Sequence, residues 1–229
     1  YEKPYERPAP TKIPAGRIEL ELPSAGPFLN SALSLSDAIA SMRFSKGGAI
    51  RFLVHAREPV GLIQARSCVS VVARLLAPPF GGNVHNRAQG GIGAGDLAQL
   101  GYEAPVETSG RGWRAYTQRG ANGFLFSVYL QWTERSGVWE AAWSVASSIE
   151  GKNPLDLARQ RVEKALSTGF AQMLGSHRAW WQAYWTSASV RLPDPVIERQ
   201  WYLDQYKFGS AARRGAPGAF LVGDMPYLS

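Results

Sequence analysis

The feature that most constrains the fold is a change in the spacing of apolar residues at Asn153-Pro154. Before this point, apolar and polar residues alternate in short runs, which is typical of strands. After it, apolar residues recur every three or four positions, which is typical of helices. Asn153 can cap a helix, Pro154 suits its first position, and Asp156 complements the positive helix N-terminus. The chain is therefore predicted to join two architectures.

The part before Asn153 has the pattern of an antiparallel β-sandwich. Its clearest alternation is residues 123–132, which places Leu125, Ser127, Tyr129 and Gln131 on one face and Phe124, Phe126, Val128, Leu130 and Trp132 on the other. Residues 29–41 are mixed, and strand is favoured there over a helical turn near 36–40. Further strands are predicted at 17–22, 42–44, 50–55, 62–65, 69–76, 113–118 and 138–148, with a turn at Lys46-Gly47-Gly48 that closes a hairpin.

Helices are predicted from Asn153 onward. One apolar face runs from Leu155 to about Leu174, and Ser176 can cap a second helix in which Trp181, Tyr184 and Trp185 share one face. Asp194 with Pro195 predicts the start of a third helix. Aromatic residues at helical spacing pack against a neighbouring element more often than they stack on sugars, so we interpret this cluster as a packing surface.

Composition excludes few classes of function. The chain has 229 residues, 45% of them apolar, which is ordinary for a globular protein, and no run of about eighteen apolar residues predicts a membrane span. The net charge of +7 is scattered, which favours a diffuse basic surface over a nucleic acid or acidic glycan partner. Cys68 is the single cysteine, so no disulfide is expected. Because the chain begins at Tyr1, we expect a processed or excised piece.

No motif predicts catalysis by this chain itself. Residues 90–95 (GGIGAG) have the wrong glycine spacing for a dinucleotide site, and strands follow them. The histidines, His55, His85 and His177, lack the spacing of metal ligands. Asp194 is interpreted as a helix cap, while Glu198 and Asp204 are six positions apart and cannot form a carboxylate pair on one helix face. We assign no catalytic residue, no metal ligand and no cofactor.

The helical part resembles a known family. The matching residues are His177, Trp181, Trp185, the run 190–194 (VRLPD), Glu198, Tyr202, Tyr206 and Arg213-Arg214-Gly215. They are similar to the linker and first barrel helix of glycoside hydrolase family 95, the alpha-L-fucosidase-like enzymes. Upstream, Leu33-Ser34-Leu35, Ala38-Ile39-Ala40, Leu100-Gly101-Tyr102 and Gln118 also fit, so the resemblance covers about residues 17–216. After Ala216 the chain departs from the family pattern, which suggests a truncated or altered tail.

The resemblance implies an antiparallel β super-sandwich followed by a helical linker and the first helix of an incomplete (α/α)6 barrel. The expected divisions are an extended lead-in (1–16), the sandwich (17–150), the linker (151–190) and the start of the barrel (191–229). The missing barrel would be the intramolecular partner, in contact with a domain interface formed by His177, Trp180, Trp181, Trp185, Glu198, Tyr202 and Tyr206. If that barrel is missing, the face from Trp180 to Trp201 should be partly exposed.

The implied function is that of an N-terminal, non-catalytic fragment of an inverting exo-alpha-L-fucosidase-like enzyme that acts on an oligosaccharide or glycoconjugate. A secreted or periplasmic location is favoured over a cytoplasmic one. Two alternatives remain open: a stand-alone β-sandwich that binds carbohydrate or a protein partner, and part of a disaccharide phosphorylase. The helical tail argues against the stand-alone module, because its aromatic helix would lack a partner.

Overall fold

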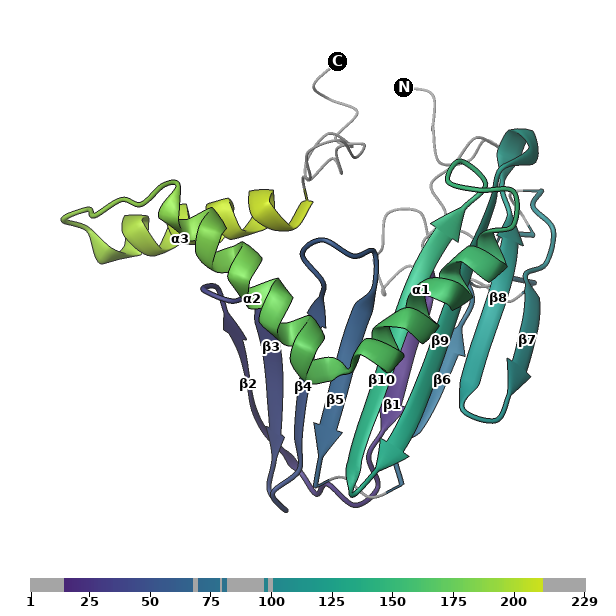
Figure 1. Cartoon of the computed structure of the whole chain (residues 1–229), viewed down its shortest axis with the longest axis horizontal. Coiled ribbons are helices and arrows are strands. Elements are labelled where there is room, and N and C mark those ends of the chain that lie inside the picture. The colour runs from purple at the N-terminus through teal and green to yellow at the C-terminus, as the bar shows by residue number, and fades with distance from the viewer. Residues whose placement is uncertain (1–14, 68–69, 79, 82–96, 99–100, 212–229) are drawn as a thin grey trace.

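The computed structural model describes residues 15–67, 70–78, 80–81, 97–98 and 101–211. Its main layer is one large antiparallel sheet of eight strands. In spatial order these are β2 (Phe28–Ser34), β3 (Ile39–Phe44), β4 (Ala49–Val54), β5 (Gly61–Arg66), β10 (Val138–Ser147), β9 (Leu125–Arg135), β8 (Trp113–Arg119) and β7 (Val106–Gly110). The sheet is curved, and β2 and β7 form its two edges (Figure 1).

Most of the predicted strands are present at nearly the predicted positions. The alternation in residues 123–132 is confirmed: Tyr129 joins the core cluster beneath the helices, while Phe126, Val128 and Leu130 face the opposite layer. The mixed segment at 29–41 is a hairpin of β2 and β3, joined by a turn in which Ala38 has φ +48. Strand β7 is not predicted from sequence, because VETSG contains a single apolar residue. The glycine-rich run at 90–95 lies outside the described residues.

A second, smaller layer packs on one face of the sheet. Strands β1 (Arg17–Glu21) and β6 (Val72–Leu76) pair antiparallel, and apolar residues of both pack against Ile50, Ile63 and Trp139 of the large sheet. The small layer covers only part of this face. A cavity of about 760 Å³ therefore opens beside β1, lined largely by apolar side chains that include Leu20, Phe52 and Val145.

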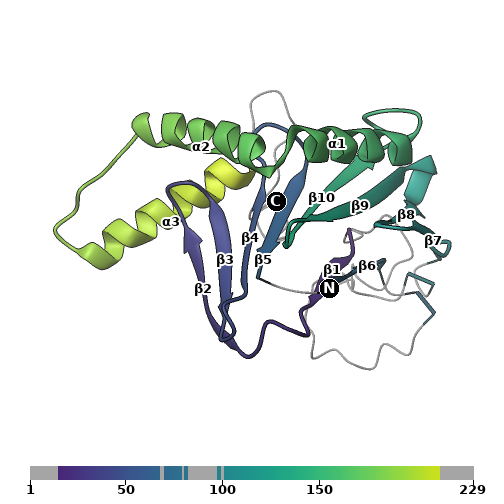
Figure 2. The same ribbon diagram turned by 60° about the horizontal axis from the view of Figure 1, so that its bottom comes forward.

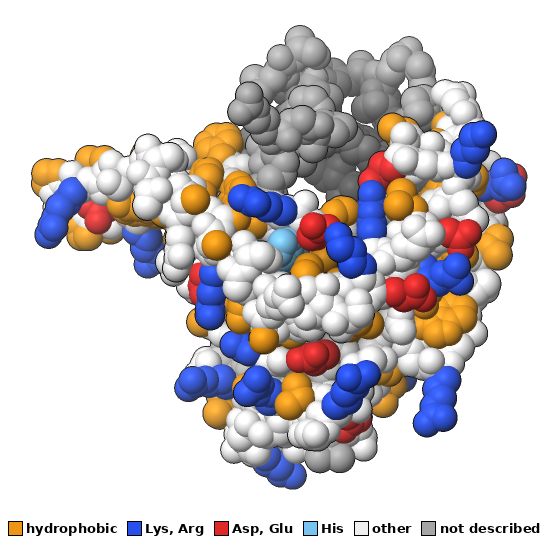
Figure 3. Space-filling view, in the orientation of Figure 1, with side chains coloured by type: hydrophobic (Ala, Val, Ile, Leu, Met, Phe, Trp, Pro, Cys, Tyr) orange, Lys and Arg blue, Asp and Glu red, His pale blue; other side chains and the backbone are white. Residues whose placement is uncertain are grey.

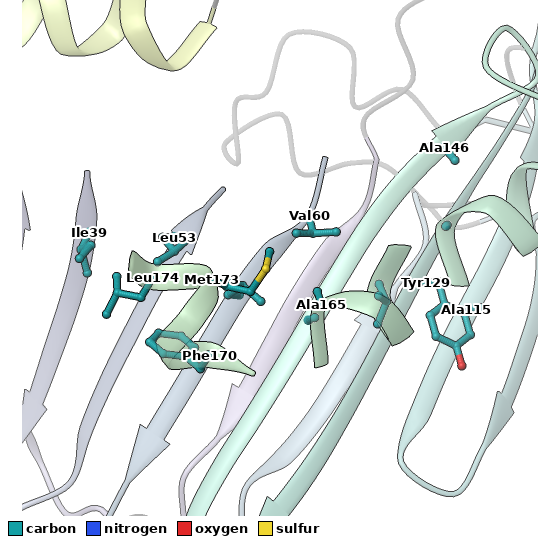
Figure 4. Close-up of a cluster of buried hydrophobic side chains, with 14 residues drawn as sticks. Ile39, Leu53, Val60, Ala115, Tyr129, Ala146, Ala165, Phe170, Met173 and Leu174 are labelled. Atoms are coloured by element: carbon teal, nitrogen blue, oxygen red, sulfur yellow. The ribbon is translucent and has the colours of Figure 1, made fainter. Parts of the chain in front are cut away.

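Two helices cover the opposite face of the sheet (Figure 2). Helix α1 (Pro154–Thr168) packs on β9 and β10, and helix α2 (Phe170–Thr186) continues towards β3. Phe170, Met173 and Leu174 of α2 share one core cluster with Ile39 and Leu53 of the sheet (Figure 4). Burying such side chains stabilises the fold by about 1.5–3 kcal/mol each.

The boundary between these helices differs from the prediction. The chain breaks at Gly169, whose φ of +87 is accessible to glycine at little cost, and α2 begins directly after it. Ser176 is therefore not a cap. It lies inside α2, where its hydroxyl donates a hydrogen bond to the Met173 carbonyl at 3.0 Å. His177 accordingly lies in the middle of the helix and not at its start.

The third helix, α3 (Pro195–Ala211), begins where the sequence predicts. Asp194 Oδ1 accepts a hydrogen bond from the Val196 amide at 2.8 Å, which satisfies one of the free N–H groups of the first turn. The helix lies beside α2, and the pair projects past the β2 edge of the sheet (Figures 1 and 2). The predicted fold class, mainly antiparallel β with C-terminal helices, is confirmed. None of the described helices is long and apolar enough to cross a membrane.

Candidate functional site

The site that the sequence singles out is a cluster of aromatic side chains between α2 and α3, which we call the aromatic interface. It consists of Trp180, Trp181, Tyr184 and Trp185 from α2, and Tyr202 and Tyr206 from α3. Trp181 lies at its centre and is only 1% exposed. Its ring centroid lies 6.0 Å from that of Trp185 and 5.5 Å from that of Tyr206. These distances fall within the range of favourable aromatic pairs.

Close approach of the two helices depends on Gly209 of α3. A Cβ atom at this position would lie 2.9 Å from the Tyr184 ring and 3.0 Å from the Trp181 ring, closer than side chains tolerate. Two tyrosine hydroxyls add hydrogen bonds, one between the two helices and one from α3 to the segment that connects them. Tyr184 donates to the Gln205 carbonyl at 2.8 Å, and Tyr202 donates to the Val190 carbonyl at 3.0 Å. The interface is therefore packed and hydrogen-bonded within the chain itself.

His177 connects α2 to two turns at the end of the sheet. Its Nδ1 accepts a hydrogen bond from the Ala56 amide at 3.1 Å, so the proton of the neutral ring is on Nε2. That Nε2–H donates to the Asp37 carbonyl at 2.7 Å. The next residue of α2, Arg178, pairs with the Asp37 carboxylate at 3.0 Å. A fully buried histidine that bonds two backbone groups serves to position α2.

The contact of His55 with His177 is the feature of the site that the sequence did not predict. The ring centroid of His55 lies 5.7 Å from that of His177, although the two residues are far apart in sequence. His55 Nδ1 accepts hydrogen bonds from the Arg57 and Glu58 amides, and its Nε2 lies 3.1 Å from the Met173 carbonyl. No local motif signals this pair, because the contact exists only once the turn after β4 meets α2.

Burial lowers the pKa of His55 below its usual value, and repulsion from His177 lowers it further. The hydrogen bond to Met173 and the charge of Glu58 act in the opposite direction, while Arg57 adds to the lowering. The neutral ring is thus favoured, which agrees with a Nδ1 atom that accepts two amide hydrogens. This arrangement is that of a structural histidine, since both nitrogens are already occupied.

Trp185, Trp180 and Glu198, the remaining predicted interface residues, differ in what they contact. Trp185 is near the sheet, where its Nε1–H donates to the Leu35 carbonyl at 3.0 Å. Trp180 stacks on Tyr184 with a centroid separation of 5.3 Å and stays half-buried. Glu198 is not part of the aromatic interface: its Oε2 accepts a hydrogen bond from the Leu192 amide at 2.6 Å, so it fastens the segment that precedes α3.

The face from Trp180 to Trp201 is expected from sequence to be partly exposed: in the structure Trp180, Trp185 and Trp201 are half-buried, whereas Trp181 is buried because α3 covers it. On α3 itself, three apolar side chains are exposed: Val196, Ile197 and Phe208, at 74%, 58% and 57%. Among the residues that the structure describes, no group of three or more His, Cys, Asp or Glu side chains could hold a metal ion. Asp204 bonds Gln200 and Lys207 on the surface of α3.

Comparisons with known proteins show a similarity at the level of the fold. No family model and no curated protein matches the chain. Among solved structures, it is similar to a protein described as "Putative kojibiose phosphorylase from human microbiome", with a TM-score of 0.54 and 11% sequence identity. The match covers 88% of this chain and 33% of that protein. The chain thus shares that protein's fold over most of its own length and spans about a third of it.

Proposed function

We propose that this chain is the N-terminal, non-catalytic part of a carbohydrate-active enzyme, in which a β-sandwich and its linker helices support a helical barrel that carries the active site. The fold it shares with a protein named as a disaccharide phosphorylase is the observation that carries this proposal. The aromatic interface supports it as well, because it orders α3 as a platform with exposed Val196, Ile197 and Phe208 for further helices to cover.

The parent enzyme that the sequence resemblance favours is an inverting exo-alpha-L-fucosidase-like glycosidase. In such an enzyme one carboxylic acid protonates the leaving oxygen, and a second group activates the water that attacks the opposite face of the sugar. The carboxylates of α3 do not suit these roles, since Glu198 bonds the backbone of Leu192 and Asp204 bonds Lys207. The acid and the base would therefore belong to the barrel.

The proposal is tested by comparing this chain with a longer protein that includes the segments encoded on either side of it. We expect no turnover by the chain alone and release of fucose from an aryl alpha-L-fucoside by the longer protein. Proton NMR of the first product formed would show the inverted anomer. A longer protein without any barrel segment, or one that turns over no glycoside, would contradict the proposal.

A phosphorylase parent is the alternative that a specific observation favours, namely the name of the structural neighbour. The same longer protein separates the two cases. Cleavage of kojibiose that requires inorganic phosphate and yields a sugar phosphate would identify a phosphorylase, whereas cleavage that is independent of phosphate would identify a hydrolase. If instead the chain by itself binds a neutral oligosaccharide and no encoded barrel adjoins it, a stand-alone binding module is the better description.

A further inference from the structure

The face of the large sheet that carries α1 and α2 also carries a row of arginines that neither helix covers. Figure 3 shows Lys and Arg side chains gathered on this face, over the part of the sheet below the helices. Arg43, Arg66 and Arg135 are all exposed there. They come from β3, β5 and β9, at the ends of the strands far from α3 (Figure 1).

The register of the sheet places these three arginines in one line. Arg43 is opposite Ala49, Ala49 is opposite Arg66, Arg66 is opposite Val138, and Val138 is opposite Arg135. Since neighbouring strands lie about 4.8 Å apart, successive arginines are spaced by about 10 Å. The residues between them, Ala49 and Val138, carry no charge. A line of cations at a regular interval suits a linear polymer with regularly spaced anions.

Beside the row, the same face carries both a further cation, Arg51, and a carboxylate, Glu140. Arg51 lies two residues along β4 from Ala49, 5.3 Å over the ring of Phe170, and shares an acceptor with Arg66. That acceptor, Gln64 Oε1, is an uncharged amide oxygen. Burial lowers the pKa of Arg51, and the charges of Arg66 and Arg178 lower it further. Glu140 is paired with Gln64 across β10 and β5, and its Oε1 accepts a hydrogen bond from Gln64 Nε2.

We propose that the row of Arg43, Arg66 and Arg135 is a binding surface for an acidic polysaccharide that carries a carboxylate or sulfate on alternate sugars. Guanidinium groups form paired hydrogen bonds to either anion. A polysaccharide rather than a nucleic acid is chosen for two reasons. The choice rests in part on the proposed carbohydrate function, and Phe170, the aromatic ring beside Arg51, is only 5% exposed and offers no platform for a base.

The surface would hold the enzyme on its polymeric substrate or on a matrix that contains it, at a distance from the aromatic interface. Its contacts are exposed ion pairs, so each is weak and salt-sensitive, and the affinity arises from their number. The test uses the full 229-residue chain and three polymers at low ionic strength: hyaluronan, which carries a carboxylate on alternate sugars, kappa-carrageenan, which carries a sulfate on alternate sugars, and single-stranded oligothymidine. Binding is measured by isothermal titration calorimetry.

The test variant combines Arg43→Gln, Arg66→Gln and Arg135→Gln. Its matched control combines Arg57→Gln, Arg111→Gln and Arg199→Gln, three exposed arginines on other parts of the molecule that remove the same net charge. Circular dichroism establishes that both variants are folded. We expect the row variant to bind at least one acidic polysaccharide about tenfold or more weakly than the unsubstituted chain, and the control to bind within about twofold of it.

The two polysaccharides identify which anion the surface prefers. If the row variant and the control variant lose affinity equally, net charge alone determines binding, and the proposal is overturned. Absence of binding to either polysaccharide would overturn it too, as would tighter binding of oligothymidine through the same arginines, which would assign the surface to nucleic acid. None of these results affects the proposed glycosidase function, which the assay of the longer protein tests separately.

Discussion

At the scale of single residues, the pair His55 and His177 determines how α2 is held on the sheet. Each ring uses a nitrogen to accept backbone amide hydrogens, and each bonds a backbone carbonyl through the other. A proton on Nδ1 would point at the backbone N–H groups from which this nitrogen now accepts hydrogen bonds. The attachment of α2 is thus sensitive to pH through His55, because a buried imidazolium would have no acceptor at Nδ1.

The first prediction concerns the pH dependence of stability. The pKa of His55 is lower in the folded chain than the usual value of about 6.5 that applies when it is unfolded. Between these two pKa values the unfolded state binds more protons, so the free energy of unfolding rises with pH through this window. The stabilisation is fully present above about pH 6.5 and is lost as the pH falls towards the folded pKa.

Urea unfolding between pH 7.5 and pH 5 measures this dependence. His55→Asn should flatten it, because the amide keeps an acceptor and a donor but does not titrate. His85→Asn is the control, since it leaves both rings of the pair in place. A slope that is unchanged in the His55 variant would show that this ring does not titrate differently on folding.

At the scale of elements, helix α3 is attached to the rest of the molecule through α2. Its own sequence supplies an N-cap at Asp194, but a single helix of this length is marginal in water, so its stability comes from the aromatic interface. Gly209 is the position at which that contact is closest. Substitution there tests whether the two helices are docked in solution.

The second prediction is that Gly209→Ala loosens the interface. The added methyl group would meet the rings of Tyr184 and Trp181, which would have to move and lose contact. We expect destabilisation of about 1–3 kcal/mol, with a weaker near-ultraviolet circular dichroism signal from the tryptophans.

Gly175→Ala is the matched control in α2. A Cβ atom there meets nothing within 4 Å, so the control should gain about 0.5–1 kcal/mol from its better helix propensity. A Gly209 variant that is also stabilised would contradict the docked arrangement.

At the scale of the whole molecule, the two faces of the large sheet are covered to different extents. Helices α1 and α2 bury Leu53 and Leu62 on one face, whereas β1 and β6 leave an apolar cavity open on the other. An open apolar surface of this kind binds hydrophobic probes even in a folded protein.

The third prediction is that the folded chain binds the dye anilinonaphthalene sulfonate in this cavity. Val145→Lys should reduce the fluorescence of the bound dye, since Val145 lines the cavity and is 39% exposed. Val106→Lys on β7 is the control, because Val106 is 65% exposed but does not line the cavity. A cooperative thermal transition distinguishes this binding from that of a molten globule. Equal fluorescence in both variants would place the dye elsewhere.

The sequence by itself determined the local elements of this protein. Alternation placed the faces of β9, the change of period located α1, and Asp194-Pro195 set the start of α3, since caps and periodicity are properties of neighbouring residues. The family resemblance grouped Trp181, Trp185, Tyr202 and Tyr206 as contacts with a barrel, and in the structure they pack between α2 and α3. The break at Gly169 and strand β7 were not predicted, because their sequence signals are weak.

Only the tertiary structure decided which distant residues meet. The pairing of His55 with His177, the docking of Gly209 on Trp181, and the line of Arg43, Arg66 and Arg135 each join residues from elements separated by many positions in the chain. Such contacts follow from the order of strands in the sheet and from the path of the helices across it. Both are settled by the burial of the whole core, to which many residues contribute and which no local pattern specifies.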